Sequence, residues 1–252
     1  MRALVLGGGG IAGIAWETGI LYGLGDSVLD VDIIIGTSAG SAVGAGVSQI
    51  PLAEAFERQT SPVPETDNST RPVPSVHKLM QIFTVIQSLP AEEARLKLGE
   101  VALSAETMPE EIWLQVIGSA LPSYEWPDRN VATVAVDAET GETRVFNRES
   151  GVDLLKAVAA SCAVPGIYPP VTIDGKRYMD GGTRTTTNAD LVAEYDDILV
   201  IAPIPDTLQL PNARVITPDA ASQAAMSMNV LDPSTRIPSA HAGFAQGKGL
   251  AI

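Results

Sequence analysis

The chain has 252 residues, and its 16 Lys and Arg stand against 30 Asp and Glu, which gives a formal net charge of −14. This acidic balance argues against nucleic acid as a partner, because phosphate binding needs a cationic face, and it disfavours docking onto a strongly anionic membrane. Hydrophobic residues make up 45% of the chain, with 23 Gly and 18 Pro. Such a composition is typical of a globular protein with many tight turns, and we expect residues 1–252 to form a single domain.

The counts of cysteine and histidine exclude several kinds of site. Cys162 is the only cysteine, so the chain forms no intrachain disulfide and no multi-cysteine zinc site. With two histidines, His77 and His241, a metal site would consist mainly of carboxylates, and we expect neither a metal nor another cofactor. The sequence opens on an apparent strand without a signal peptide, and no run of 18 apolar residues follows. We therefore expect a cytoplasmic protein without a transmembrane segment.

Strand and helix signals alternate through the first third of the chain. A short run of Leu and Val at residues 2–6 precedes four glycines, and a helix is expected from about residue 13 to residue 24. Residues 31–35 form a β-branched run that is too short for a helix and too apolar for a strand with one solvated face. Such runs are typical of parallel strands covered on both faces. A second helix is expected from residues 36–38 to residue 49.

The remaining elements follow a polar loop with four prolines at residues 62–74. We expect helices over residues 75–89, 91–104, 108–121, 152–161 and 189–195, and a further helix that begins at about residue 218. We expect strands over residues 131–136, 143–146, 171–179, 198–202 and 213–216, of which the first two form a hairpin. This alternation predicts an α/β fold, a three-layer α/β/α sandwich with a mainly parallel central sheet.

Gly36-Thr37-Ser38-Ala39-Gly40 fits the G-x-S-x-G pattern between a buried strand and a helix. In that setting the serine lies on a sharp turn with its hydroxyl exposed, as a nucleophile requires. Gly36 and Gly40 are needed because side chains at these positions would collide with the neighbours of the turn. The N-terminus of the following helix adds a positive field that stabilises developing negative charge. The alternative is a Ser38 that only caps the helix.

The glycines at residues 7–10, followed by Gly13, also lie between a strand and a helix. Their spacing satisfies the G-x-G-x-x-G pattern of dinucleotide-binding folds, so an oxidoreductase that binds a nucleotide is one alternative. That function needs an acid at the end of the second strand, whereas Asp32 lies at its start. The N–H groups of such a loop can instead bind an oxyanion, and adjacent parallel strands bring the loop and Ser38 to one edge of the sheet. A purely structural glycine turn is a further alternative.

A nucleophilic serine needs a group that takes its proton, and Asp180 is the best candidate. It ends a predicted strand and is followed by Gly181 and Gly182, which allow backbone and substrate to approach closely. The alternative for Asp180 is a simple Asp-Gly turn. The order Ser, Asp, His of α/β-hydrolases does not fit, because only one strand precedes the serine. His77 and His241 are better explained by surface or packing roles.

Three ordered motifs together resemble those of the patatin-like phospholipases: the glycine loop at residues 8–13, the serine elbow at residues 36–40 and Asp180-Gly181-Gly182. The run from Ala160 to Pro170 looks like the segment that precedes the aspartate motif in that family. The resemblance extends from residue 4 to about residue 205. It implies a patatin-like α/β/α fold that hydrolyses acyl esters of lipids with a Ser–Asp dyad and without histidine.

The resemblance also implies a role for each matching position. Ser38 is the expected nucleophile and Asp180 the expected proton acceptor. The expected oxyanion donors are the backbone N–H groups of Gly8, Gly9, Gly10 and Ala39, and the other motif positions are Gly13, Gly36, Gly40, Gly181 and Gly182. One position departs from the family, because many members have Arg or Lys immediately before the last glycine of the first motif, where this chain has Ala12. A catalytically degenerate member that binds lipid is therefore a third alternative.

The acyl chain of a lipid needs an apolar surface, and the helix expected at residues 75–89 offers one. Its apolar residues are Leu79, Met80, Ile82, Phe83, Val85, Ile86 and Leu89. We hypothesise that this helix is a lid or a wall of an acyl pocket, and an ordinary core helix is the alternative. The expected partner is a lipid or another acyl-ester substrate, and transient contact with a membrane surface stays open.

Overall fold

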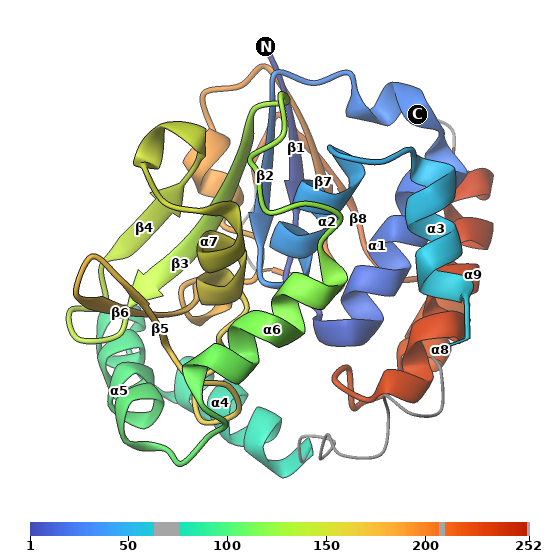
Figure 1. Cartoon of the computed structure of the whole chain (residues 1–252). Helices are drawn as coiled ribbons and strands as arrows, with labels where there is room; N and C mark the ends of the chain where they lie inside the picture. The colour runs from blue at the N-terminus through green and yellow to red at the C-terminus, as the bar shows by residue number, and fades with distance from the viewer. Residues whose placement is uncertain (63–75, 207–209, 251–252) are drawn as a thin grey trace.

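The computed structural model describes residues 1–62, 76–206 and 210–250, and it has an α/β fold in which helices cover both faces of a mixed sheet (Figure 1). The strands are β1 (Arg2–Leu6), β2 (Ile33–Thr37), β3 (Val131–Asp137), β4 (Thr143–Phe146), β5 (Val171–Ile173), β6 (Lys176–Asp180), β7 (Asp197–Ile201) and β8 (Ala213–Ile216). In the described residues they form one sheet of order β5-β6-β3-β2-β1-β7-β8, with β4 also paired to β3. The predicted α/β class is therefore confirmed.

Parallel pairing joins β3, β2, β1, β7 and β8, whereas β4 and β6 pair antiparallel to β3, and β5 pairs antiparallel to β6. The helices are α1 (Gly10–Leu24), α2 (Ala39–Val47), α3 (Leu52–Thr60), α4 (Val76–Ser88), α5 (Ala91–Ser104), α6 (Glu110–Ala120), α7 (Leu154–Ser161), α8 (Ala220–Met226) and α9 (Arg236–Gly249). Short 3-10 turns include η4 (Gly181–Thr183) and η5 (Ala189–Val192).

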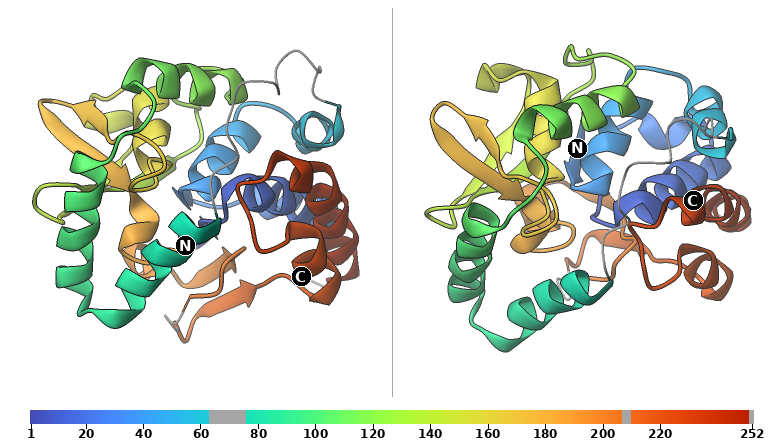
Figure 2. Two further views of the ribbon diagram at one scale, coloured as in Figure 1. Left: turned by 90° about the horizontal axis from the view of Figure 1, so that it is seen from below. Right: turned by 60° about the horizontal axis from the view of Figure 1, so that its bottom comes forward.

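Side chains alternate across the central strands, so each face of the sheet has its own core. Leu4 and Leu6 of β1 pack with Ile34 in the cluster that includes side chains of α1, α2 and α3. Val5 and Ile35 point to the opposite face, which η5 covers, and α4 and α5 extend that cover over β3 and β6. Figure 2 shows α4 and α5 on the other side of the strands from α1 and α2. Burial on both faces explains why these strands are continuous apolar runs.

The pairing of β3 determines which strand ends meet. Along one edge, β3 pairs with β4 from Thr133 to Val136. The residues of β3 that pair with β2 (131–134) and with β6 (135–137) overlap this stretch. Because β4 occupies one edge, β2 and β6 must both lie along the other edge of β3. There Thr37, the last residue of β2, pairs with Val134, and Asp180, the last residue of β6, pairs with the adjacent Ala135. Because β2 and β6 run in opposite directions, their carboxyl ends meet end to end beside β3.

Two strands, β5 and β6, replace the single strand predicted at residues 171–179. Asp174 and Gly175 have positive φ angles of 51° and 76°, and the chain reverses direction there in a tight hairpin. Asp-Gly is a strong signal for such a turn, because both central residues must adopt positive φ. The prediction was wrong at this point, and the hairpin is what turns β6 antiparallel to β3.

Two helices, α3 and α9, are absent from the predicted elements, and the helix predicted at residues 189–195 is the short turn η5. The helix α9 lies along α1 (Figure 1) and contacts it through glycines. A Cβ on Gly19 would lie 2.2 Å from Ala240 O, and a Cβ on Gly243 would lie 2.3 Å from Trp16 O. The Gly- and Ala-rich segment of α9 is therefore helical because of this close packing, and helix propensity alone does not predict it.

The helix α4 contributes to the core on one side. Ile82, Val85 and Ile86 pack against the cluster formed by α5, β3 and β6, whereas Met80 is 52% exposed. The side chains of Leu79 and Phe83, and residues 63–74 of the predicted loop, lie outside the described residues. The three packed side chains fit the core-helix alternative, and the lid hypothesis stays a prediction.

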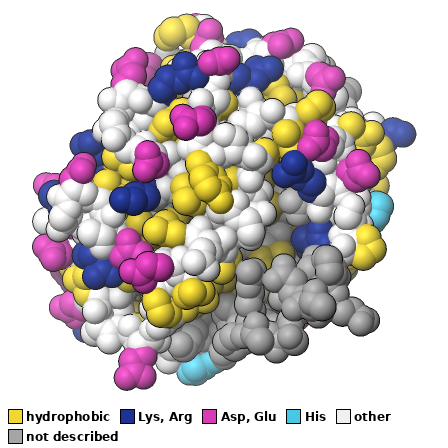
Figure 3. Space-filling model, in the orientation of Figure 1, with side chains coloured by type: hydrophobic (Ala, Val, Ile, Leu, Met, Phe, Trp, Pro, Cys, Tyr) yellow, Lys and Arg dark blue, Asp and Glu magenta, His cyan; other side chains and the backbone are white. Residues whose placement is uncertain are grey.

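Figure 3 shows how charged side chains are distributed on one face of the molecule. On the face in Figure 3, Lys and Arg are interspersed with Asp and Glu, so the acidic excess is not gathered into one patch there. Among the helices that the structure describes, none combines the length and the apolar character that crossing a bilayer requires.

We expect Gly243→Ala to destabilise the fold, because its new methyl group would collide with the carbonyl oxygen of Trp16. Overpacking of this kind costs on the order of 1–3 kcal/mol, and each kcal/mol lowers Tm by roughly 2–4 °C in a chain of this size. Gly249→Ala is the matched control, since nothing lies within 4 Å of its added Cβ. Thermal unfolding followed by circular dichroism measures both, and an equal Tm for the two variants would contradict the close contact of α1 with α9.

Candidate active site

Ser38 forms the turn between β2 and α2 and has a strained backbone, with φ of 52° and ψ of −118°. A positive φ at a residue other than glycine costs on the order of 1–3 kcal/mol, and such strain is common where a nucleophile is exposed on an elbow. The flanking glycines make this turn sterically feasible. A Cβ on Gly36 would lie 2.4 Å from Gly40 O, and a Cβ on Gly40 would lie 2.1 Å from Leu6 O.

Asp180 lies directly beside this serine. Ser38 Oγ donates a hydrogen bond to Asp180 Oδ2 at 2.6 Å, and Gly182 N–H donates to Asp180 Oδ1 at 2.7 Å. Ser38 is 9% exposed and Asp180 is 4% exposed, so the pair is largely shielded from water. Gly181 packs tightly against β3, because a Cβ there would lie 2.3 Å from Val134 O. The structure thus brings the elbow and the Asp-Gly-Gly motif into direct contact.

Burial changes the acidity of this carboxyl group. Desolvation raises the pKa of Asp180 from 3.8 to about 7, although the hydrogen bonds from Ser38 and Gly182 oppose the shift because they stabilise the carboxylate. A carboxylate with a pKa near neutral pH is a stronger base than an ordinary aspartate, and much of it is still ionised at that pH. The environment therefore suits Asp180 to proton transfer.

The glycine loop lies against the elbow. A Cβ on Gly8 would lie 3.5 Å from the Cβ of Ser38, and Gly40 N–H donates to Gly7 O at 2.9 Å. Gly8 differs from the expectation, because its N–H donates to Thr186 O at 2.8 Å and is occupied. The N–H groups of Gly9, Gly10 and Ala39 have no acceptor among the described residues.

The helices α1 and α2 begin at Gly10 and Ala39, so two helix N-termini lie at the site. Each carries a partial positive charge, which favours an anion between them. Gly10 has a φ of 61°, and a Cβ there would lie 2.8 Å from Val230 O. Gly13 packs against Ala39, because its Cβ would lie 3.4 Å from the Ala39 Cβ. The shape of the loop thus requires glycine at residue 10, and it leaves little free space around Gly13.

Ala12 lies inward, away from solvent. Its side chain is fully buried in the core cluster of α1, and its N–H donates to Val230 O at 3.0 Å. Gly9 faces Pro203, because a Cβ added to Gly9 would lie 2.5 Å from the Cβ of Pro203. The position that is basic in many relatives is therefore part of the apolar core in this chain.

Ser161 and Cys162, at the end of α7, hold the backbone of Ser38 and were missed as site residues. Ser38 N–H donates to Ser161 Oγ at 2.9 Å, and the Cys162 thiol donates to Ser38 O at 3.1 Å. Burial raises the pKa of Cys162 to about 12, so its thiol stays protonated and remains a donor. The only signal for these contacts in the sequence is the family-like run at residues 160–170.

A buried acid in α1 was also missed. Glu17 is fully buried, and among the described residues the polar group that acts on its carboxyl group is the backbone N–H of Gly7, whose well-formed hydrogen bond goes to Ile201 O. Burial raises the pKa of Glu17 well above its usual value, and the backbone N–H of Gly7 opposes the shift, so the fold favours the neutral form of this carboxyl group. The signal for it is that Glu17 is the one charged residue in the sequence of α1.

The remaining candidates lie apart from the dyad. His241 packs its ring edge-on against Phe56, and His77 Nε2 lies 3.1 Å from the Gln81 amide nitrogen within α4. Asp32 precedes β2 and accepts a hydrogen bond from Arg2 N–H, at the end of the sheet opposite to the elbow. In the described part of the chain, no group of three or more His, Cys, Asp or Glu could hold a metal ion.

Comparison with known proteins identifies the family. A family model described as Patatin-like phospholipase matches residues 4–193. This match covers well over half of the chain, and the chain therefore belongs to the patatin-like phospholipase family, whose members are of the lipid hydrolase kind. The resemblance predicted from the three motifs is confirmed.

Individual relatives are distant and mostly much longer. The chain is 27% identical over 201 residues to patatin-like phospholipase domain-containing protein ZK370.4 of Caenorhabditis elegans. The matched region covers 79% of this chain and 13% of that protein. The chain is 26% identical over 182 residues to lysophospholipase nte1 of Aspergillus oryzae, covering 71% of this chain and 10% of that protein. The crystal structure of VipD from Legionella pneumophila matches 86% of this chain and 49% of its own, with 12% identity and a TM-score of 0.43.

We expect the stability of the fold to depend on the ionisation of Asp180. Its pKa is about 7 in the folded protein, whereas an aspartate in an unfolded chain has a pKa near ~3.9. The folded state therefore holds the proton more tightly, and stability is lost as the pH rises from about 4 towards 7. Asp180→Asn keeps an acceptor for Ser38 Oγ but has no proton to lose.

The free energy of unfolding of the wild type should therefore fall relative to that of Asp180→Asn across this pH range, as measured by urea unfolding. Asp30→Asn, which changes an exposed carboxylate, is the control and should follow the wild type. Parallel pH profiles for the wild type and Asp180→Asn would contradict the raised pKa.

Proposed function

We propose that this chain is a serine acyl hydrolase that cleaves carboxylic ester bonds of lipids, with Ser38 as the nucleophile and Asp180 as the base. The observation that carries the proposal is the 2.6 Å hydrogen bond from Ser38 Oγ to Asp180 Oδ2 within a buried, strained elbow. Membership of a family of lipid hydrolases supports the choice of substrate class. The name of one relative, a lysophospholipase, agrees with it.

In the first step Ser38 Oγ attacks the carbonyl carbon of the ester while Asp180 takes the hydroxyl proton. The hydrogen bond already points this proton at the carboxylate, so no rearrangement is needed before transfer. The carbonyl π bond opens, and its electron pair becomes the negative charge of a tetrahedral oxyanion. When the intermediate collapses, the ester oxygen leaves as an alcohol with the proton from Asp180, and an acyl-enzyme remains on Ser38.

The oxyanion requires hydrogen-bond donors that are not already occupied. We assign this role to the N–H groups of Gly9 and Gly10, supplemented by that of Ala39, since Gly8 N–H is used by Thr186 O. Such preorganised donors usually provide the largest part of catalysis by acyl-transfer enzymes. The field of two helix N-termini acts in the same direction. Backbone N–H groups thus stabilise the oxyanion without the basic side chain that many relatives also have, because this chain has Ala12 at that position.

The second step reverses the roles of the groups. Water enters the space left by the alcohol. The water oxygen attacks the acyl carbon while Asp180 takes a proton from the same water molecule. The second tetrahedral intermediate uses the same donors, and its collapse breaks the bond to Ser38 Oγ, which recovers a proton from Asp180. A fatty acid is released, and both residues return to their initial state without a histidine.

We infer a lipid or another acyl ester as the partner, bound only transiently at a membrane or micelle surface. The chain has a net charge of −14, so anionic lipids should repel the enzyme more than zwitterionic lipids do. The apolar helix α4 is our candidate for a wall of the acyl-binding region, since Met80 is exposed next to its packed face.

We expect Ser38→Ala and Asp180→Asn to lower kcat for p-nitrophenyl acyl esters by at least ~10³-fold, because each removes a group that bonds or transfers a proton in every turnover. A fluorophosphonate probe should label the wild type and leave Ser38→Ala unlabelled. Ser119→Ala changes an exposed serine in α6 and should behave as the wild type in both assays. A folded wild type that neither reacts with the probe nor hydrolyses esters would instead indicate a degenerate member that only binds lipid.

We expect Gly10→Ala to reduce turnover by about 100-fold, because loss of one oxyanion donor costs on the order of 3 kcal/mol. The added Cβ would lie 2.8 Å from Val230 O, so the loop must shift and carry the Gly10 N–H with it. Gly151→Ala is the matched control, since Gly151 also has a positive φ, 71°, but its Cβ would meet nothing within 4 Å. Turnover is compared with Tm for both, and equal activity of the two variants would argue against an oxyanion role for the loop.

A further inference from the structure

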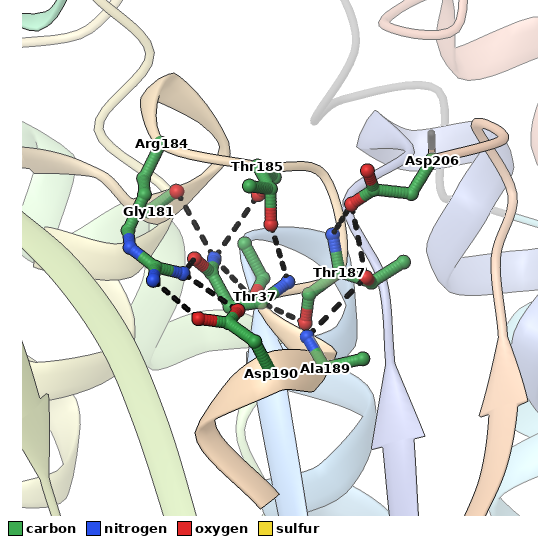
Figure 4. A network of polar contacts seen from close by, with 9 residues as sticks. Thr37, Gly181, Arg184, Thr185, Thr187, Ala189, Asp190 and Asp206 are labelled. Carbon is green, nitrogen blue, oxygen red and sulfur yellow. Dashed lines mark hydrogen bonds and ion pairs between the residues drawn. The ribbon is translucent and has the colours of Figure 1, made fainter. Parts of the chain in front are cut away.

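A polar cluster in residues 184–190, here called the brace, contacts all three motif segments, and Figure 4 shows it beside Thr37 and Gly181. At the glycine loop, Thr186 O accepts the hydrogen bond from Gly8 N–H at 2.8 Å. The other two segments are joined through one side chain, that of Asn188, which is fully buried. The brace therefore connects the loop, the elbow and the aspartate turn.

The Asn188 amide spans the junction between β2 and β6. Its Nδ2 donates to Thr37 Oγ1 at 3.1 Å and to Gly181 O at 3.1 Å, and Thr185 O at 3.0 Å is a third acceptor. Thr37 is the residue before the proposed nucleophile, and Gly181 is the residue after the proposed base. An amide NH₂ has two hydrogens, so the donor capacity of Asn188 is fully used here.

The backbone of Asn188 is held in a conformation that turns the side chain inward. Its φ of 52° and ψ of 31° lie in the left-handed region, which asparagine tolerates better than most residues. Its N–H donates to Thr185 Oγ1 at 2.8 Å, which fixes the turn. Both the residue type and its conformation are therefore matched to the position.

An ion pair sets the orientation of this amide. Arg184 donates to Asn188 Oδ1 at 2.8 Å and to both carboxylate oxygens of Asp190 (Figure 4). Arginine has only donors, so it must face the amide oxygen, and the NH₂ group is left to face Thr37 and Gly181. The hydrogen bond from Arg184 lowers the pKa of Asp190, so the pair stays charged.

The strand ladder holds β2 and β6 each to β3 but does not join them to each other. The pairing of β2 to β3 ends at Thr37 and that of β6 to β3 ends at Asp180, and the two strands meet end to end with no ladder between them. A bridge across this point must come from side chains. The Ser38–Asp180 hydrogen bond is one such bridge, and the Asn188 amide is another.

We propose that Asn188 is a positioning residue for the hydrolysis proposed above, on which this inference rests. It holds Thr37 and Gly181 at a fixed distance, and the ion pair of Arg184 with Asp190 keeps its amide in the required orientation. The separation of the nucleophile from the base, and hence the rate of the chemical step, depends on this bridge.

The direct test is Asn188→Asp, which keeps the shape and the acceptor for Arg184 but replaces the NH₂ donor by an oxygen. We expect kcat for p-nitrophenyl esters to fall by about 100-fold, because a small misplacement of reacting groups has an effect of this size. KM should stay within about twofold of the wild type, because the substrate-binding surface is unchanged. The rate of fluorophosphonate labelling of Ser38 should fall in parallel. Asp190→Asn, a milder variant that loosens the orienting pair, should lower kcat by a smaller factor.

The control separates positioning from general destabilisation. Ser222 is as fully buried as Asn188, and Ser222→Ala removes its hydrogen bond to the half-buried Gln246 Oε1, outside the brace. It should retain the kcat of the wild type at temperatures well below its Tm. Wild-type kcat in Asn188→Asp, or equal losses of kcat in Asn188→Asp and Ser222→Ala, would overturn the proposal.

A crystal structure makes the test independent of catalysis. In Asn188→Asp, or in Asp190→Asn if the first variant does not fold, the separation of Ser38 Oγ from Asp180 Oδ2 should exceed hydrogen-bonding range. An unchanged separation overturns the positioning role. Absence of labelling in the wild type, by contrast, contradicts the proposed hydrolase function and leaves the structural measurement to decide on the brace.

Discussion

One edge of β3 determines the arrangement of the site, because β2 and β6 share it. Thr37 and Asp180 pair with adjacent residues of β3, although they are far apart in the sequence. Any side chain that follows β2 must then lie beside the last side chain of β6. The elbow, the glycine loop and the brace are arranged around that meeting point, and each contributes contacts that the strand ladder does not supply.

The site combines several locally unfavourable features that the surrounding fold offsets. Ser38 has a strained backbone, Asp180 is a buried acid with a raised pKa, and Glu17, whose carboxyl group is affected by the backbone N–H of Gly7, is a fully buried acid with a raised pKa. Each of these costs free energy of folding. They persist because apolar cores cover both faces of the sheet, and because strain and desolvation are common where a site is preorganised for chemistry.

Much of the fold follows from local patterns, and the parts that do not have identifiable causes. The apolar runs of β1 and β2, the G-x-S-x-G elbow and the Asp-Gly-Gly turn each carry their own signal, so the motif positions could be predicted. Asn188 and Ser161 could not, because ordinary polar residues acquire a role only through contacts more than 120 residues away in the chain. The helix α9 was missed for a similar reason, since its glycines make it helical only against α1.

The contacts behind the glycine loop define how much of the polypeptide works as one physical unit. Pro203 and Val230 shape the loop, and α9 packs along α1, the helix that begins at the loop. All of them lie beyond residue 193, where the match to the family model ends. The region matched by the family model contains Ser38 and Asp180, whereas residues from the last quarter of the chain pack against the glycine loop and determine its shape. A substitution in that quarter can therefore change the shape of the glycine loop without altering any of the three motifs.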